Sequence, residues 1–285
     1  MALKMKIFRK QDILKTLEMI KSRRFPTFLK LAAHLVGQKP IKGFDKVKVY
    51  FYAKNGLEIG GPSFIFSSKS ILPIYEIANN IDNCNFSHQT IWEGKIREGL
   101  TFNYTRNRLG HQFIFECTDL KGIKSASYDF VISSHVIEHT ANPLKALLEW
   151  KRVLKRGGVM LLVLPHKEGT FDHNRPATRI DHLIEDFKKN VDERDLSHLP
   201  EILNLHDLSM DLQAGTFENF CERSINNFKN RCLHHHVFVA ESVVQMIDYV
   251  GLKIIFLTTH PPYHIITLCQ KTTNQEIEIH SSNNP

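Results

Sequence analysis

Residues 128–165 most constrain what this chain can fold into, because they read as a strand, a helix and a second strand joined by short connections. An apolar run at 129–133 is followed by Pro143, which predicts a helix through Leu154, and by Gly157 and Gly158, which end it before the apolar run 159–164. Parallel strands buried on both faces read as continuous apolar runs, and a parallel pair needs a crossover of this length. We predict a βαβ unit with both strands buried.

The rest of the chain continues this alternation. We expect further strands at 47–59, 81–86, 112–117, 253–257 and 264–270, and helices at 181–190 and 237–250. Pro73 interrupts any helix between the first two strands, and residues 88–110 look like a loop-rich excursion. The pattern predicts an α/β fold with a doubly wound, mostly parallel sheet.

Four segments follow from this pattern. Residues 1–45 form a basic, helical N-terminal arm, and residues 46–271 form the α/β domain. Within the domain, residues 166–236 change to acidic, histidine-rich helices and loops, so we expect an insertion over the end of the sheet. Residues 272–285 form a polar tail.

The net charge of +7 is concentrated in the arm. Residues 1–50 hold 13 Lys or Arg against three acids, which leaves an acidic remainder. Apolar residues recur at helical spacing between Phe25 and Val36, so the arm is predicted to contain a basic amphipathic helix. A helix packed on the domain is one interpretation, peripheral contact with an anionic membrane is another, and nucleic acid is the partner we expect least.

Composition places the chain among ordinary globular proteins. No apolar run approaches the roughly 20 residues that span a bilayer, and the N-terminus lacks an apolar signal-peptide core, so we expect a cytoplasmic protein. The five cysteines are scattered without a CxxC pair, as is typical of reduced thiols. The sequence does not indicate an oligomeric state.

Ligands of a doubly wound sheet bind outside the carboxyl ends of its strands. The residues expected there are Glu58 to Ser63, Asp82, Asp119 with Leu120, Ser134 with His135, and Pro165 with His166. Acids at three strand ends would repel a phosphate. They suit a cationic ligand that carries hydroxyls and an amine.

The chain resembles the class I S-adenosylmethionine-dependent methyltransferases, within the methyltransferase type 11 group. The resemblance rests on the motif Asp129-Phe130-Val131-Ile132, Val136-Ile137-Glu138-His139, Pro143, Leu147, Glu149, Arg152 to Gly158 and Pro165. One departure is Pro62, which stands where the family has the second glycine of its first loop. The resemblance implies a Rossmann-like fold and S-adenosyl-L-methionine as the cofactor.

The resemblance also implies roles for individual residues. Glu58, Gly60, Gly61 and Pro62 would form the loop against the methionine part of the cofactor, and Asp82 would accept hydrogen bonds from the ribose. Asp119 and Leu120 would hold the adenine, while Ser134 and His135 would lie beneath the sulfonium.

Methyl transfer is an in-line displacement, and a hydroxyl acceptor benefits from a histidine general base. His166, directly after the fifth-strand proline, is the first candidate, followed by His135 and His139. The expected acceptor pocket uses Glu138 and the insertion residues Asp172, His173, His234, His235 and His236. These histidines invite a metal hypothesis, but without HxxxH or HExxH spacing we expect no metal there.

We therefore predict O-methylation of a small-molecule or glycan acceptor. Methylation of a nitrogen or of a macromolecule is the alternative within the enzymes. A non-catalytic, cofactor-binding scaffold docked through the basic arm is the alternative of another class.

Overall fold

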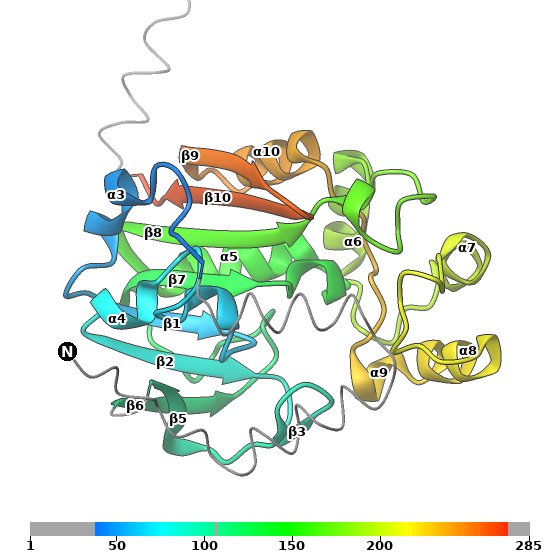
Figure 1. The fold of residues 1–285 in the computed structure, drawn as a ribbon, viewed down its shortest axis with the longest axis horizontal. Helices are drawn as coiled ribbons and strands as arrows, with labels where there is room; N and C mark the ends of the chain where they lie inside the picture. The colour runs from blue at the N-terminus through cyan, green and yellow to red at the C-terminus, as the bar shows by residue number, and fades with distance from the viewer. Residues whose placement is uncertain (1–37, 106–107, 273–285) are drawn as a thin grey trace, which may run out of the picture.

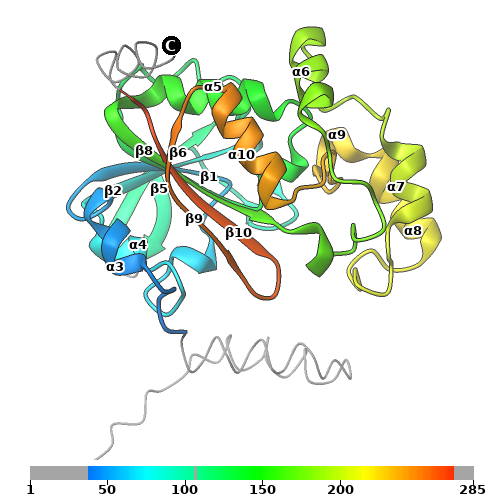
Figure 2. The same ribbon diagram turned by 90° about the horizontal axis from the view of Figure 1, so that it is seen from above.

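The computed structural model describes residues 38–105 and 108–272. They form an eight-stranded sheet in the order β5-β6-β2-β1-β7-β8-β10-β9, flanked by helices, with a further group of helices beyond one end (Figures 1 and 2). The predicted basic helix and nearly all of the predicted polar tail lie outside the described residues. None of the helices in the described ranges is long and apolar enough to cross a membrane.

Five neighbouring strands of the sheet are parallel. Strand β10 is antiparallel to both of its neighbours, and β5 is antiparallel to β6 at the opposite edge. The strands are β1 (Asn55–Ile59), β2 (Asn80–Asn85), β5 (Gly99–Thr105), β6 (Arg108–Ile114), β7 (Tyr128–Ser134), β8 (Leu154–Pro165), β9 (Lys253–His260) and β10 (His264–Gln270). A separate hairpin consists of β3 (Gln89–Thr90) and β4 (Gly94–Lys95). The predicted doubly wound, mostly parallel sheet is confirmed.

Helices cover both faces of the sheet (Figure 2). On one face, α5 (Pro143–Val153) and α10 (Ala240–Tyr249) bury residues such as Trp150 and Met246 against the strands. On the other, α3 (Phe44–Val47), α4 (Ile74–Ile77) and the short turns η1 (Lys48–Tyr50) and η2 (Phe64–Phe66) form a second apolar layer. Ile41 and Phe44, which the sequence assigned to the arm, belong to this layer.

The predicted βαβ unit is β7, α5 and β8. Asn142 caps α5 by accepting a hydrogen bond from the Lys145 amide at 3.1 Å, and Pro143 occupies the first turn. The helix ends at Val153, before the two glycines, because Leu154 is already extended and begins β8. The sequence therefore located this unit correctly and placed the start of its second strand five residues too late.

Three other predicted boundaries were wrong. The first strand begins at Asn55 and not at residue 47, because the chain before it forms helical turns in which Phe44 and Val47 are buried. Residues 88–110 contain β5 and the start of β6, which pair along the sheet edge. The third predicted strand, β6, ends at Ile114, three residues before its predicted end. The second strand, β2, matches the predicted 81–86 within one residue, so Asp82 lies inside it, paired with Leu57, and does not mark its end.

The insertion between β8 and α10 lies at the carboxyl ends of the parallel strands (Figures 1 and 2). It contains η4 (Lys167–Gly169), α6 (Ile180–Lys189), α7 (Leu199–Leu205), α8 (Phe217–Ile225) and α9 (Asn227–Asn230). Its outer helices have a small core of their own around Ile202 and Phe220. The predicted helix at 181–190 is confirmed as α6.

Glu58 near the end of β1 is fully buried. Its carboxylate accepts hydrogen bonds from the Tyr75 hydroxyl at 2.6 Å and the Ser63 amide at 3.0 Å. Burial outweighs these bonds and raises the pKa of Glu58 to about 7. Through its hydrogen bond with the Ser63 amide, Glu58 holds the loop that follows β1.

Because folding raises this pKa, the native state binds the proton more tightly than the unfolded chain. The contribution to stability is present below pH 4.5 and is lost as the pH rises towards 7. E58Q imitates the protonated side chain and does not titrate. We expect its free energy of unfolding to gain about 2 to 3 kcal/mol on wild type between pH 5 and pH 8. Urea unfolding of both proteins without cofactor measures this, and a pH-independent difference would contradict it.

Candidate active site

A cavity of about 260 Å³ opens at the carboxyl edge of the sheet. Its walls come from the ends of β1, β2, β6 and β7, from the β3–β4 hairpin and from the insertion. The lining residues are Ile59, Gly60, Cys84, Asn85, Phe86, Thr90, Trp92, Glu93, Phe115, Glu116, Cys117, Ser134, His135, Val136, His139, Thr140, Glu193 and Arg231. A hollow of about 350 Å³ shares Asn85 and Glu93 with it and continues over Gly61 and Pro62.

The loop after β1 lies close to the strands beside it. Gly60 has a φ of +82°, and a Cβ there would lie 2.6 Å from the Val136 side chain. At Gly61, a Cβ would lie 2.2 Å from the Glu58 carboxyl group. Asn83 and Asn85 of β2 each donate a hydrogen bond to the Gly61 carbonyl at 3.1 Å, so two side chains of this one strand hold the loop.

Ser134 is the last residue of β7 and His135 follows it, so both lie at the predicted strand end and line the cavity. His135 adopts a left-handed conformation, φ +55°, which is uncommon for a residue with a Cβ. Its Nδ1 lies 3.2 Å from Glu138 Oε1, and its Nε2 lies 3.1 Å from His264 Nδ1. The ring is 29% exposed, so it is open to the cavity while the carboxylate fixes its orientation.

Glu138 is completely buried beneath this ring. Burial alone would raise its pKa, but the hydrogen bond from His135 and the charges of His135, His139 and His234 lower it. Among the described residues, no hydrogen-bond donor other than His135 reaches the carboxylate. Glu138 is therefore an ionised partner for His135. It does not line the cavity, where the sequence placed it in the acceptor pocket, but lies behind His135 and orients its ring.

His139 lines the cavity as a neutral imidazole. Burial and the charge of His234 lower its pKa to about 4. Its Nδ1 lies 3.0 Å from the Leu233 carbonyl oxygen, so this nitrogen carries the proton and Nε2 is left as an acceptor. Its ring packs 5.5 Å from that of Trp92, which is half exposed at the cavity rim.

Arg231 connects the insertion to the sheet at the cavity wall. Its guanidinium bonds to Glu116 Oε1 at 2.7 Å and Glu193 Oε2 at 3.1 Å, and it lies 4.9 Å above the Phe86 ring. Two carboxylates thus share one cation beside the cavity. Neither Arg231 nor its partners were singled out from the sequence, because Glu116 lies within the predicted strand 112–117 and not past its predicted end.

Of the five other residues predicted for the acceptor pocket, all but His173 are buried inside the protein. Asp172 bonds to Arg175 and His234, which together lower its pKa to about 2 against the effect of burial. His235 bonds to Asn227, and His236 faces the Ala141 carbonyl at 3.2 Å. His173 pairs with Asp207 near the surface. None of these five predicted residues lines the cavity.

Four predicted residues lie elsewhere for identifiable reasons. Asp82 sits inside β2 and binds the His111 amide and the Tyr128 hydroxyl, each at 2.8 Å. Because β6 ends at Ile114, residues 115–117 form the cavity wall, while Asp119 points to solvent beside Lys121 and Leu120 is in the core. His166 caps η4 outside the cavity lining. These placements correct the roles expected for Asp82, Asp119, Leu120 and His166.

Comparison with known proteins yields one family. Residues 97–162 match the model of the type 11 family, described as a methyltransferase domain. No curated protein matches the chain.

Solved structures give further matches. A SAM-dependent methyltransferase from Aquifex aeolicus is 13% identical, with 80% of this chain and 89% of that chain covered and a TM-score of 0.41. One from Methanosarcina mazei is 11% identical, with 83% and 100% covered and a TM-score of 0.45. One from Mesorhizobium loti is 9% identical, with 80% and 95% covered and a TM-score of 0.44.

The matched segment contains β7, the turn after it and α5, which together carry the cavity base, and the sheet is mostly parallel, with the antiparallel β10 between β8 and β9. The chain is therefore an S-adenosylmethionine-dependent methyltransferase with a type 11 methyltransferase domain.

Proposed function

We propose that this methyltransferase transfers the methyl group to an oxygen of a hydroxylated small-molecule or glycan acceptor, with His135 as the general base. The observation that carries the proposal is the pair formed by His135 and the buried Glu138 at the cavity base. A carboxylate on Nδ1 holds the imidazole in one tautomer and stabilises the imidazolium formed when Nε2 takes a proton. An alcohol needs such a base, whereas a neutral amine does not.

In this mechanism the cofactor supplies an electrophilic methyl group. The chain holds the acceptor oxygen on the axis of the breaking sulfur–carbon bond, beside Ser134 and His135. His135 Nε2 exchanges its contact with His264 for one with the acceptor hydroxyl, and His139 offers a second neutral acceptor. The exposed Trp92 ring at the rim suits the C–H face of a sugar.

Glu116 supports the placement of the cofactor. Its carboxylate faces the cavity directly after β6, where it would accept a hydrogen bond from the cofactor's amino or hydroxyl groups. Charge-assisted hydrogen bonds are stronger than neutral ones.

We expect E116Q to weaken S-adenosylmethionine binding about tenfold or more, because the amide replaces a charged acceptor. D82N is the matched control, because Asp82 lies outside the cavity lining and Asn can still bond to the His111 amide and the Tyr128 hydroxyl. Calorimetric titration of the three proteins measures this. A larger loss of S-adenosylmethionine affinity in D82N than in E116Q would instead support Asp82 as the residue that binds the ribose.

H135N tests the base. Asn tolerates the left-handed conformation of this position and cannot act as a base at neutral pH. We expect kcat for methyl transfer to fall by roughly 10²- to 10⁴-fold while cofactor affinity stays within a few-fold of wild type.

H166N is the comparison variant, and we expect it to retain the wild-type rate. Loss of turnover in H166N with activity retained in H135N would instead support the base first chosen from the sequence.

A panel of sugars, small alcohols, amines, peptides and oligonucleotides tests the acceptor class with cofactor labelled in the methyl group. We expect labelled ethers from hydroxylated substrates. Labelled amines or macromolecules would favour the alternative acceptors. Cofactor binding without any product would favour the scaffold.

A further inference from the structure

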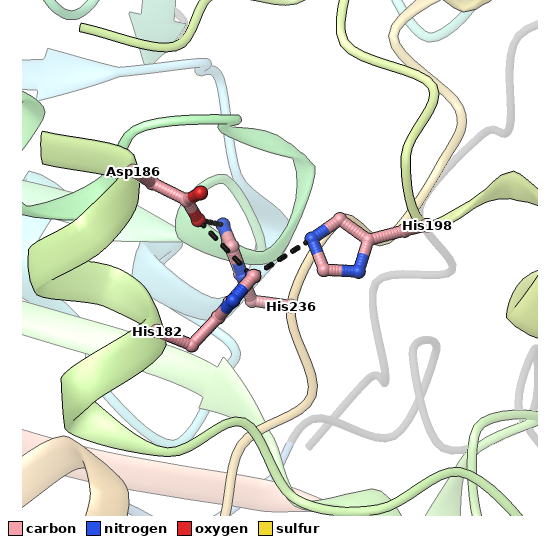
Figure 3. Close-up of side chains that lie close together, drawn as sticks. All are labelled: His182, Asp186, His198 and His236. Atoms are coloured by element: carbon pink, nitrogen blue, oxygen red, sulfur yellow. Dashed lines mark hydrogen bonds and ion pairs between the residues drawn. The ribbon is translucent and has the colours of Figure 1, made fainter. Parts of the chain in front are cut away.

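A second group of histidines lies in the insertion, outside the cavity lining. His182 and Asp186 are four residues apart on α6 and therefore share one face of that helix. His198 precedes α7, and His236 comes from the segment leading to α10. Figure 3 shows the four side chains converging from these three segments. One ligand atom from each lies within 4.8 Å of all the others.

The spacing of these atoms fits a tetrahedral metal ion. His182 Nε2 is 3.0 Å from His198 Nε2 and 3.2 Å from Asp186 Oδ2. The His236 ring lies beside the same carboxylate oxygen, and because its Nε2 faces the Ala141 carbonyl, its Nδ1 is the nitrogen left to bind an ion. Bonds of about 2.0 to 2.1 Å to zinc place tetrahedral ligand atoms about 3.4 Å apart. The two separations given for His182 are slightly shorter than this value.

Hydrogen bonds within the described residues leave this cluster incompletely satisfied. Asp186 Oδ2 and His236 Nδ1 are buried atoms without a hydrogen-bond partner there. Two imidazole nitrogens of His182 and His198 face each other, although at most one can donate in that contact. Buried polar atoms without partners are costly, so an ion that accepts these lone pairs would relieve the cost.

We propose that His182, Asp186, His198 and His236 bind one structural Zn²⁺. Three imidazoles and one carboxylate are a donor set that zinc accepts, and four protein ligands close the coordination sphere against a substrate. The site is separate from the methyl-transfer cavity, and of the histidines for which the sequence predicted no metal it includes His236 alone.

The ion holds the cavity wall. Asp186 and His198 flank residues 187–197, which carry Glu193. Glu193 accepts a hydrogen bond from the Ala141 amide at 3.4 Å and pairs with Arg231 beside the cavity. Fixing both ends of this loop therefore keeps the Arg231 bridge between insertion and sheet in place.

The test uses the full chain, purified without a polyhistidine tag and without added metal. Elemental analysis is expected to find about one zinc per chain after gel filtration. Removal with a chelator is expected to lower Tm by roughly 5 °C or more, and added Zn²⁺ to restore it. Both readouts are independent of methyl transfer, so they remain informative if the acceptor proposal fails.

H198Q and H182Q are expected to lose the bound zinc and the Tm response while keeping the circular dichroism of the wild type. H173Q is the matched control, since His173 also pairs with a carboxylate in the insertion but lies outside the cluster. Zinc content in H198Q and H182Q equal to that of wild type would overturn the proposal. A Tm of the chelated wild-type protein that does not respond to Zn²⁺ would also overturn it.

Discussion

The parallel register of β2, β1, β7 and β8 is the constraint on which the site depends. Ile59 pairs with Cys84 on one side and Ser133 on the other, so three strands end at the same level. At this edge the chain must turn without blocking the cavity. Gly60 and His135 do so with positive φ angles, and Asn83 and Asn85 hold the first turn by hydrogen bonds. The cavity is therefore a consequence of strand pairing.

Sequence patterns predicted this framework where one physical signal dominated. The continuous apolar runs of β7 and β8, with Pro143 and the glycines between them, identified the buried βαβ unit. Sequence patterns failed to predict secondary structure where tertiary contacts determined it. Val47 and Phe51 were included in the predicted first strand, yet both lie at helical turns and pack in the apolar layer on the sheet face. Leu100, Phe102 and Tyr104 alternate with polar residues as in a strand, but the three glycines of 88–110 favoured a loop, so this edge strand was missed.

Site residues were predicted correctly only where the end of the preceding strand was predicted correctly. Ser134 and His135 follow a strand with a clear end, and both line the cavity. Asp82 lies inside β2 and not past its end, and Asp119 follows a strand that ends three residues earlier than predicted, so both fall outside the cavity lining. Arg231 is distant in sequence from Glu116, so its contribution to the wall follows from the fold of the insertion and has no local signal.

In the proposed mechanism, His135 links the geometry of the strand ends to the chemistry of methyl transfer. A crystal structure with S-adenosylhomocysteine bound tests this most directly. The account predicts the sulfur beside Ser134, with His135 Nε2 facing the open space where an acceptor oxygen would lie and Nδ1 still on Glu138. A sulfur placed away from Ser134, or a His135 ring shielded from that space, would contradict it.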